Sequence, residues 1–76
     1  MYTVDRKIIE LIDYLKSLKI IKTQKEFCDI TGIPRQRIVS VKNDGRHFSG
    51  EQIEAVCVSF KIDANYLFGL AEKPFK

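Results

Sequence analysis

Two short helical patterns separated by one glycine constrain the fold of this chain more than any other feature of its sequence. The segment from Thr23 to Gly45 reads TQKEFCDITGIPRQRIVSVKNDG. Thr23 and Glu26 have the spacing of a capping box, which predicts a helix over about residues 24–31. Gly32 can adopt the left-handed conformation that ends a helix at little steric cost. The next helix is therefore expected to follow after a sharp turn rather than after a loop.

That next helix is predicted to begin at Pro34 and to end near Asn43, because the fixed φ of proline suits the first turn of a helix. Ile38 and Val41 are spaced so that both face the core. At 100° per residue, the opposite face carries polar side chains. These are Gln36, Ser40 and Asn43, with Val39 beside them.

Helical patterns also cover most of the remaining chain, and strand patterns are almost absent. Apolar residues recur at steps of three and four between Asp5 and Leu18, which predicts one helix with a buried stripe. Ser49 and Gln52 form a second capping box, which begins a helix with Ile53, Val56, Cys57 and Phe60 on one side. Asp63 can cap a last helix through about Leu70, with Leu67 and Leu70 facing the core.

The sequence therefore predicts an all-α fold of five helices in a single domain over residues 1–76. Its core covers about residues 5–70, and a short C-terminal tail follows at 71–76. Pro74 argues against extending the last helix into that tail. A chain of 76 residues has room for one modest core.

Composition excludes several classes of protein. With 45% hydrophobic and 30% charged residues, the chain has the composition of a globular domain rather than of a disordered or membrane protein. No apolar run approaches the roughly 20 residues of a membrane span, and no signal peptide is apparent, so a cytoplasmic location is expected. Cys28, Cys57 and the single His47 lack metal-ligand spacing, so neither a metal site nor a cofactor is predicted. The cysteines are expected to fill apolar positions in the core.

The net charge is concentrated in one part of the chain. Of 13 basic and 10 acidic residues, nine of each lie outside residues 33–47, so this segment carries the whole net charge of +3. Its basic residues are Arg35, Arg37, Lys42 and Arg46, against the single acid Asp44. A solvated helix face is the ordinary interpretation of a charge run. Because the excess surrounds one polar helix, a polyanion partner is the alternative.

The helix over 34–43 offers the side chains that bind nucleic acids. Its exposed face has amide, hydroxyl and guanidinium groups and no acid before Asp44. Arginine can pair with guanine, and glutamine with adenine, in the major groove. Val39 can meet a thymine methyl group or pack on a neighbouring side chain. The preceding helix would cross the DNA backbone and present its N-terminal amides to a phosphate.

From Lys22 to about Leu70 the sequence resembles the lambda-repressor-like, or XRE-type, helix-turn-helix family, which includes phage repressors, Cro proteins and many small bacterial regulators. The matching positions are Gln24, Cys28, Gly32, Ile33, Ile38 and Val41. The later segment SGEQIEAVCVSFKIDANYLFGL is similar to the fourth and fifth helices of the family. Three departures are Pro34 in place of serine or threonine, cysteines where alanine is common, and the loop DGR after Asn43.

This resemblance implies a sequence-specific transcriptional regulator, most simply a phage-type repressor, that binds a near-palindromic operator as a homodimer through its fifth helix or tail. Arg35, Gln36 and Ser40 fall where the family contacts bases. Gln24 falls where the family contacts a phosphate and braces the first residue of the recognition helix, and Asn43 where it touches the backbone. Lys42 and Arg46 can reach phosphates, whereas Arg37 can serve either purpose. No small-molecule ligand is predicted.

Two other classes of function remain as alternatives. The first is an antitoxin or another protein-interaction module with the same fold, for which little sequence is present beyond Leu70. The second is an enzyme, which is not expected because no nucleophile with a base and no carboxylate pair is evident. A relative can also keep the fold and lose DNA binding.

Most of the aromatic residues, and the histidine, are expected to have structural roles or no special role. The aromatic side chains with helical core spacing are expected in or beside the core rather than against nucleic acid; they are Phe27, Phe60, Tyr66 and Phe68. His47 is expected to be a loop residue without a special role. Tyr2 and Phe75 belong either to loose termini or to a dimer contact.

Overall fold

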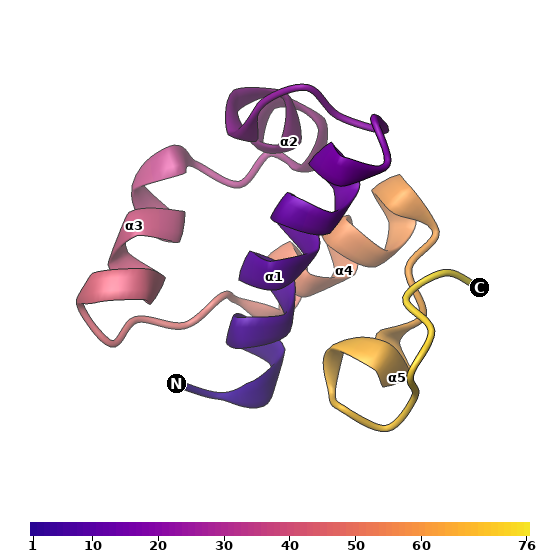
Figure 1. Ribbon diagram of the computed structural model, residues 1–76. Helices are drawn as coiled ribbons and strands as arrows, with labels where there is room; N and C mark the ends of the chain where they lie inside the picture. The colour runs from indigo at the N-terminus through magenta and orange to yellow at the C-terminus, as the bar shows by residue number, and fades with distance from the viewer.

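Five helices make up the computed structural model, which describes all residues from 1 to 76 (Figure 1). They are α1 (Thr3–Ser17), α2 (Gln24–Thr31), α3 (Arg35–Asn43), α4 (Gly50–Phe60) and α5 (Ala64–Leu67). The only β-type pairing is an isolated antiparallel bridge between Ile62 and Phe75. The predicted all-α architecture of five helices is therefore confirmed. None of these helices combines the length and the apolar character that crossing a membrane requires.

The long helix α1 runs through the middle of the molecule, with α3 on one side and α5 on the other (Figure 1). Its apolar stripe is buried, as the spacing predicts, through Ile8, Leu11, Ile12 and Leu15. This stripe joins side chains from α2, α3, α4 and α5 in one hydrophobic cluster. The other members deepest in that cluster are Ile21, Phe27, Ile33, Ile38, Val41, Val56, Ile62 and Leu67.

Helix α2 begins and ends as the sequence predicts. The Thr23 hydroxyl accepts a hydrogen bond from the Glu26 amide at 3.2 Å, and Gly32 follows the helix with φ of 76°. In a complete capping box the Glu26 carboxylate would accept from the amide of Thr23. Here it accepts instead from the Lys22 amide at 3.1 Å. Both arrangements satisfy backbone donors that a helix start leaves free.

Helix α3 begins one residue later than predicted. Pro34 has φ of −67° and ψ of 144°, so it occupies the extended position before the helix rather than the first turn. Its carbonyl accepts from the Arg37 amide at 3.0 Å, and no side chain caps this end of α3. A proline at this position keeps its preferred φ while its extended ψ turns the chain into the helix.

Helix α4 has the complete capping box. The Gln52 amide donates to the Ser49 hydroxyl at 3.1 Å, and the Ser49 amide donates to the Gln52 side chain at 2.9 Å. The buried Phe48 and the partly buried Ile53 pack in the core on either side of this cap. Farther along, Phe60 stacks on Phe27 of α2 with 5.7 Å between ring centroids.

Helix α5 is shorter than predicted, ending at Leu67 rather than near Leu70. Asp63 caps it as expected, by accepting from the Asn65 amide at 2.9 Å. Gly69 then takes a positive φ of 78°, which turns the chain away from the helix path. As a result Phe68 and Leu70 are 52% and 78% exposed, and the expectation that they pack in or beside the core is wrong.

The tail over 71–76 folds back on the connection between α4 and α5. The Asp63 amide donates to the Pro74 carbonyl at 2.8 Å, and the Lys76 amide donates to the Lys61 carbonyl at 3.1 Å. These bonds hold the partly buried Phe75 against the core, where its ring centroid lies 6.3 Å from that of Tyr14. Phe75 is therefore an ordered part of the fold rather than a loose end.

Candidate nucleic-acid interface

Helix α3 lies at one side of the molecule, away from α5 and the C-terminus (Figure 1). Ile38 and Val41 are buried, as predicted, and fasten it to the core. The rest of the helix turns outward, with Arg37 and Ser40 half-buried. Its exposed side chains are Arg35, Gln36, Val39, Lys42 and Asn43.

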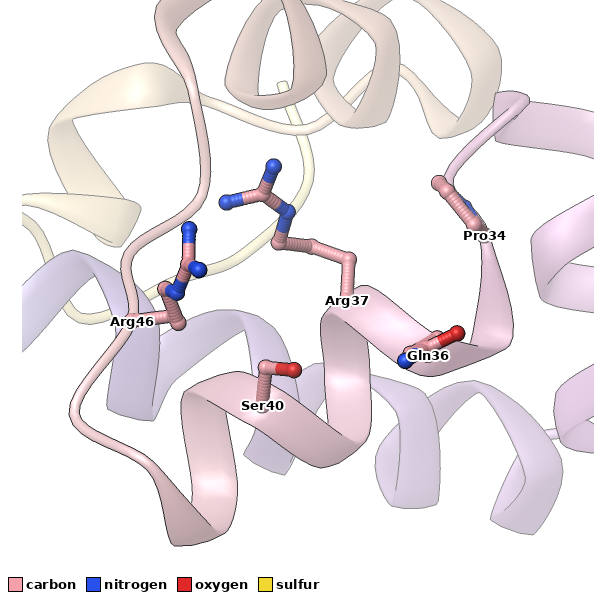
Figure 2. A pocket seen from close by; sticks show the side chains of 5 residues that line it. All are labelled: Pro34, Gln36, Arg37, Ser40 and Arg46. Atoms are coloured by element: carbon pink, nitrogen blue, oxygen red, sulfur yellow. The ribbon is translucent and has the colours of Figure 1, made fainter.

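An open hollow of ≈ 270 Å³ lies along α3, and all but one of the side chains that line it are polar or charged. It is lined by Pro34, Gln36, Arg37, Ser40 and Arg46. Figure 2 shows Gln36 and Ser40 one turn apart on α3, with the guanidinium groups of Arg37 and Arg46 on the same side of the helix. Arg46 reaches this place from the segment that follows α3. Two of the three predicted base-contacting residues are thus brought together with two predicted backbone-contacting arginines.

Backbone hydrogen bonds set the course of the segment that carries Arg46. The carbonyl of Ser40 accepts from the Asp44 amide at 2.8 Å and from the Arg46 amide at 3.3 Å. Gly45 between them has a positive φ of 70°. This compact turn is why Arg46 lies beside α3 and not beyond its end. The Ser40 hydroxyl makes no hydrogen bond within the chain, so it is free to bind a ligand.

Arg37 is the most restrained side chain around the hollow. Its Nη1 donates to the backbone carbonyl of His47 at 3.2 Å. A guanidinium has five N–H donors, so the others remain available after this bond. Arg37 and Arg46 can therefore present several donors to one anion without large rearrangement.

Arg35 lies apart from Gln36 and Ser40. It lines a second hollow of ≈ 470 Å³ between α2 and α3, together with Lys25, Cys28, Asp29, Gly32, Ile33 and Pro34. Successive residues point about 100° apart on a helix, which carries Arg35 toward α2 while Gln36 faces the first hollow. No hydrogen bond joins Arg35 to Gln24, which is half-buried in the first turn of α2.

The second hollow has less net positive charge than its cations suggest. Lys25 forms an exposed ion pair with Asp29 at 2.9 Å, and this hydrogen bond raises the pKa of Lys25. Burial raises the pKa of the Cys28 thiol, with Asp29 adding to the effect and Arg35 and Lys25 opposing it. Cys28 is thus held as a neutral thiol that packs against the core.

Lys42 and Asn43 lie in the last turn of α3 and do not line either hollow. Both are exposed, and no side-chain hydrogen bond within the chain engages them. The eight predicted site residues therefore divide by place. Four line the hollow along α3, two occupy the end of that helix, and Arg35 and Gln24 lie toward α2.

The structure shows a set of contacts around Asp5 that the sequence interpretation missed. The carboxylate of Asp5 is completely buried, and its Oδ2 lies 2.6 Å from Nδ1 of His47. Its Oδ1 accepts from the Phe48 amide at 3.0 Å, and the His47 ring stacks on Tyr2 with 4.0 Å between centroids. His47 thus has a structural role, contrary to expectation. Acids are common in the first turn of a helix, so no sequence signal marked Asp5 as the partner.

No group of three or more His, Cys, Asp or Glu side chains is placed to hold a metal ion. Comparison of the chain with protein-family models, with curated proteins and with solved structures found no match.

Proposed function

We propose that this protein is a helix-turn-helix DNA-binding regulator of the lambda-repressor-like type. The observation that carries the proposal is the hollow along α3, whose lining combines an amide, a hydroxyl and two guanidinium groups with a single proline. The same segment of the chain holds its whole net charge of +3. Hydrogen-bond donors of these kinds contact base edges and phosphates in DNA complexes.

In this mechanism α3 enters the major groove. Gln36 and Ser40 contact base edges, and Arg35 contacts a base or an adjacent phosphate from the N-terminal end of the helix. The remaining basic side chains, Arg37, Lys42 and Arg46, bind phosphates on either side, while Asn43 touches the backbone. Gln24 and the first amides of α2 approach another phosphate. Repression follows by occlusion, because a bound operator is closed to polymerase.

One α3 covers a short half-site, so the proposal includes a two-fold dimer on a near-palindromic operator in the cytoplasm. Half-sites about 34–36 Å apart would suit such a dimer. The exposed Phe68 and Leu70 at the end of α5 support a dimer contact there. The tail is a weaker candidate because Phe75 packs inward. Neither catalysis nor a cofactor is part of this proposal.

The same exposed apolar side chains support a second candidate, a protein-interaction module such as an antitoxin. In that case Phe68 and Leu70 would contact a different protein, and the polar hollow would be incidental. The two candidates differ in whether α3 selects a DNA sequence.

The decisive experiment is selection of bound sequences from a random duplex pool at near-physiological salt. Wild type is compared with an Arg35→Ala, Gln36→Ala double variant and with Lys73→Ala, which removes an exposed cation from the tail. An enriched inverted repeat that the double variant loses and Lys73→Ala keeps would support the proposed regulator. Absence of enrichment by folded wild type would reject it and favour the protein-interaction module.

A further inference from the structure

A buried carboxylate connects α1 to the segment that follows α3. Asp5 lies in the first turn of α1 and has no exposed surface. Both of its oxygens are used, Oδ1 by the Phe48 amide at 3.0 Å and Oδ2 by Nδ1 of His47 at 2.6 Å. Asp5 is the only α1 side chain that hydrogen-bonds to residues 44–49.

Burying a carboxylate is unfavourable unless hydrogen bonds and a partner compensate for the lost hydration. An apolar side chain would fill the same volume without that cost, since Asp5 is as buried as the core residue Ile8 in the same helix. An apolar residue, however, could not hold the Phe48 amide and the His47 ring. The carboxylate is therefore suited to fixing the position of this segment rather than to filling the core.

His47 connects Asp5 to Arg37 in the candidate interface. Its ring is held between Asp5 and Tyr2, whose ring lies nearly parallel to it at an angle of 10°. Its backbone carbonyl is the acceptor for Nη1 of Arg37 at 3.2 Å. The residue that Asp5 fixes is thus the residue that fixes the Arg37 guanidinium, beside Gln36 and Ser40 in the hollow.

We propose that His47, anchored by Asp5, is a positioning residue that holds the guanidinium of Arg37 ready to bind a DNA phosphate. This inference rests on the proposed DNA-binding function. A long side chain that is free in solution loses rotamer freedom when it binds, and this loss weakens binding. With Nη1 already engaged, Arg37 keeps further N–H donors for a phosphate and has less freedom to lose.

The test combines His47 and Arg37 variants on one operator at fixed salt. His47→Ala removes the Nδ1 partner of Asp5, whereas His47→Asn retains an amide nitrogen near the position of Nδ1. We expect His47→Ala to weaken DNA binding about 2- to 10-fold, the range for ordering one long side chain, and His47→Asn to recover most of the loss. In an Arg37→Ala background, His47→Ala should cause no further loss, because the group that it positions is gone.

Losses that simply add in the double variant would overturn the inference, as would unchanged binding by His47→Ala alongside weaker binding by Arg37→Ala. Circular dichroism melting of each variant establishes that it is folded at the assay temperature. A general structural role for His47 predicts a loss in both backgrounds and no rescue that depends on Arg37.

A second measurement needs no DNA. The ¹⁵N heteronuclear NOE of the Arg37 Nε–H, assigned by its absence in Arg37→Ala, reports the mobility of this side chain in the free protein. We expect His47→Ala to lower the NOE and His47→Asn to preserve it. An unchanged NOE in His47→Ala would overturn the positioning role. A lowered NOE in a protein that selects no DNA sequence would instead uphold the restraint on Arg37 and reject the proposed function.

Discussion

Gln36 and Lys42 lie on the same helix in different surroundings. We therefore expect them to contribute differently to DNA binding. Gln36 lines the hollow along α3, where its amide lies beside Ser40 and Arg37. Lys42 is exposed in the last turn and lines no hollow. An amide donor–acceptor pair can distinguish bases, whereas a flexible ammonium group binds any phosphate.

Gln36→Ala is therefore expected to cost about 1–3 kcal/mol on the selected operator and little on random DNA. Lys42→Ala should weaken both by similar amounts and should lower the slope of log K against log salt by about one unit. Fluorescence-anisotropy titrations on both DNAs over a range of salt concentrations measure these effects. Equal losses of Gln36→Ala on both DNAs would remove its assignment as a base-contacting residue.

Glycine is required at position 32 by the backbone conformation and not by lack of space for a side chain. Its φ is 76°, yet a Cβ added there would meet no atom within 4 Å. Gly32→Ala is therefore expected to destabilise the fold by about 1 kcal/mol through backbone strain alone, and Gly32→Val by more. Gly50 is the matched control, since it also has open space but no positive φ. Gly50→Ala should stay within about 0.5 kcal/mol of wild type in urea unfolding; equal losses at both glycines would contradict this explanation.

Residues whose roles depend on near neighbours in sequence were predictable, and those with distant partners were not. Gly32 could be assigned because a left-handed glycine follows directly from the helix before it. The shared outward face of Gln36 and Ser40 on α3 could be predicted from helical spacing, whereas their contact with DNA stays a prediction. Asp5 and His47 lie 42 positions apart, and only the packing of α1 against the segment after α3 brings them together.

At the scale of the elements, the starts of α2, α4 and α5 were predictable because their stabilising contacts are local. Thr23, Ser49 and Asp63 each accept a hydrogen bond from an amide two or three residues later. The end of α5 was not, because both Leu67 and Leu70 fit the helical spacing and only Leu67 reaches the core. Which of two equally spaced side chains is buried depends on the neighbouring helices, and here α1 is the principal neighbour.

The capping box of α4 provides the element-scale prediction. Ser49→Ala removes the acceptor for the Gln52 amide and should destabilise the protein by about 1 kcal/mol. Ser59 in the same helix is exposed and caps nothing, so Ser59→Ala is the control, with an expected change within about 0.5 kcal/mol. Urea unfolding followed by circular dichroism measures both. A loss from Ser59→Ala as large as that from Ser49→Ala would show that the cap contributes little.

At the scale of the whole molecule, the two ends of the chain complete opposite sides of the fold. Near the N-terminus, Tyr2 and Asp5 hold the segment beside α3 through His47. At the C-terminus, the tail pairs with the connection between α4 and α5 and packs Phe75 on the core. The candidate interface is therefore supported by α1 and lies away from the side that the tail covers (Figure 1). Neither set of contacts has a local sequence pattern, so the sequence alone does not decide whether the termini are loose ends or part of a dimer contact.

Phe75 and Phe68 form a matched pair for testing this closure of the fold. Phe75 is partly buried beside Tyr14, whereas Phe68 is 52% exposed, although helical spacing predicts Phe68 in or beside the core. Phe75→Ala should cost about 1–2 kcal/mol, less than the 3–5 kcal/mol typical of a fully buried phenylalanine. Phe68→Ala should change the free energy of unfolding of the monomer by less than about 0.5 kcal/mol. Both are measured by urea unfolding at a protein concentration where sedimentation shows a monomer. A larger loss of unfolding free energy in Phe68→Ala than in Phe75→Ala would contradict this account. It would mean that the end of α5, and not the tail, packs against the core.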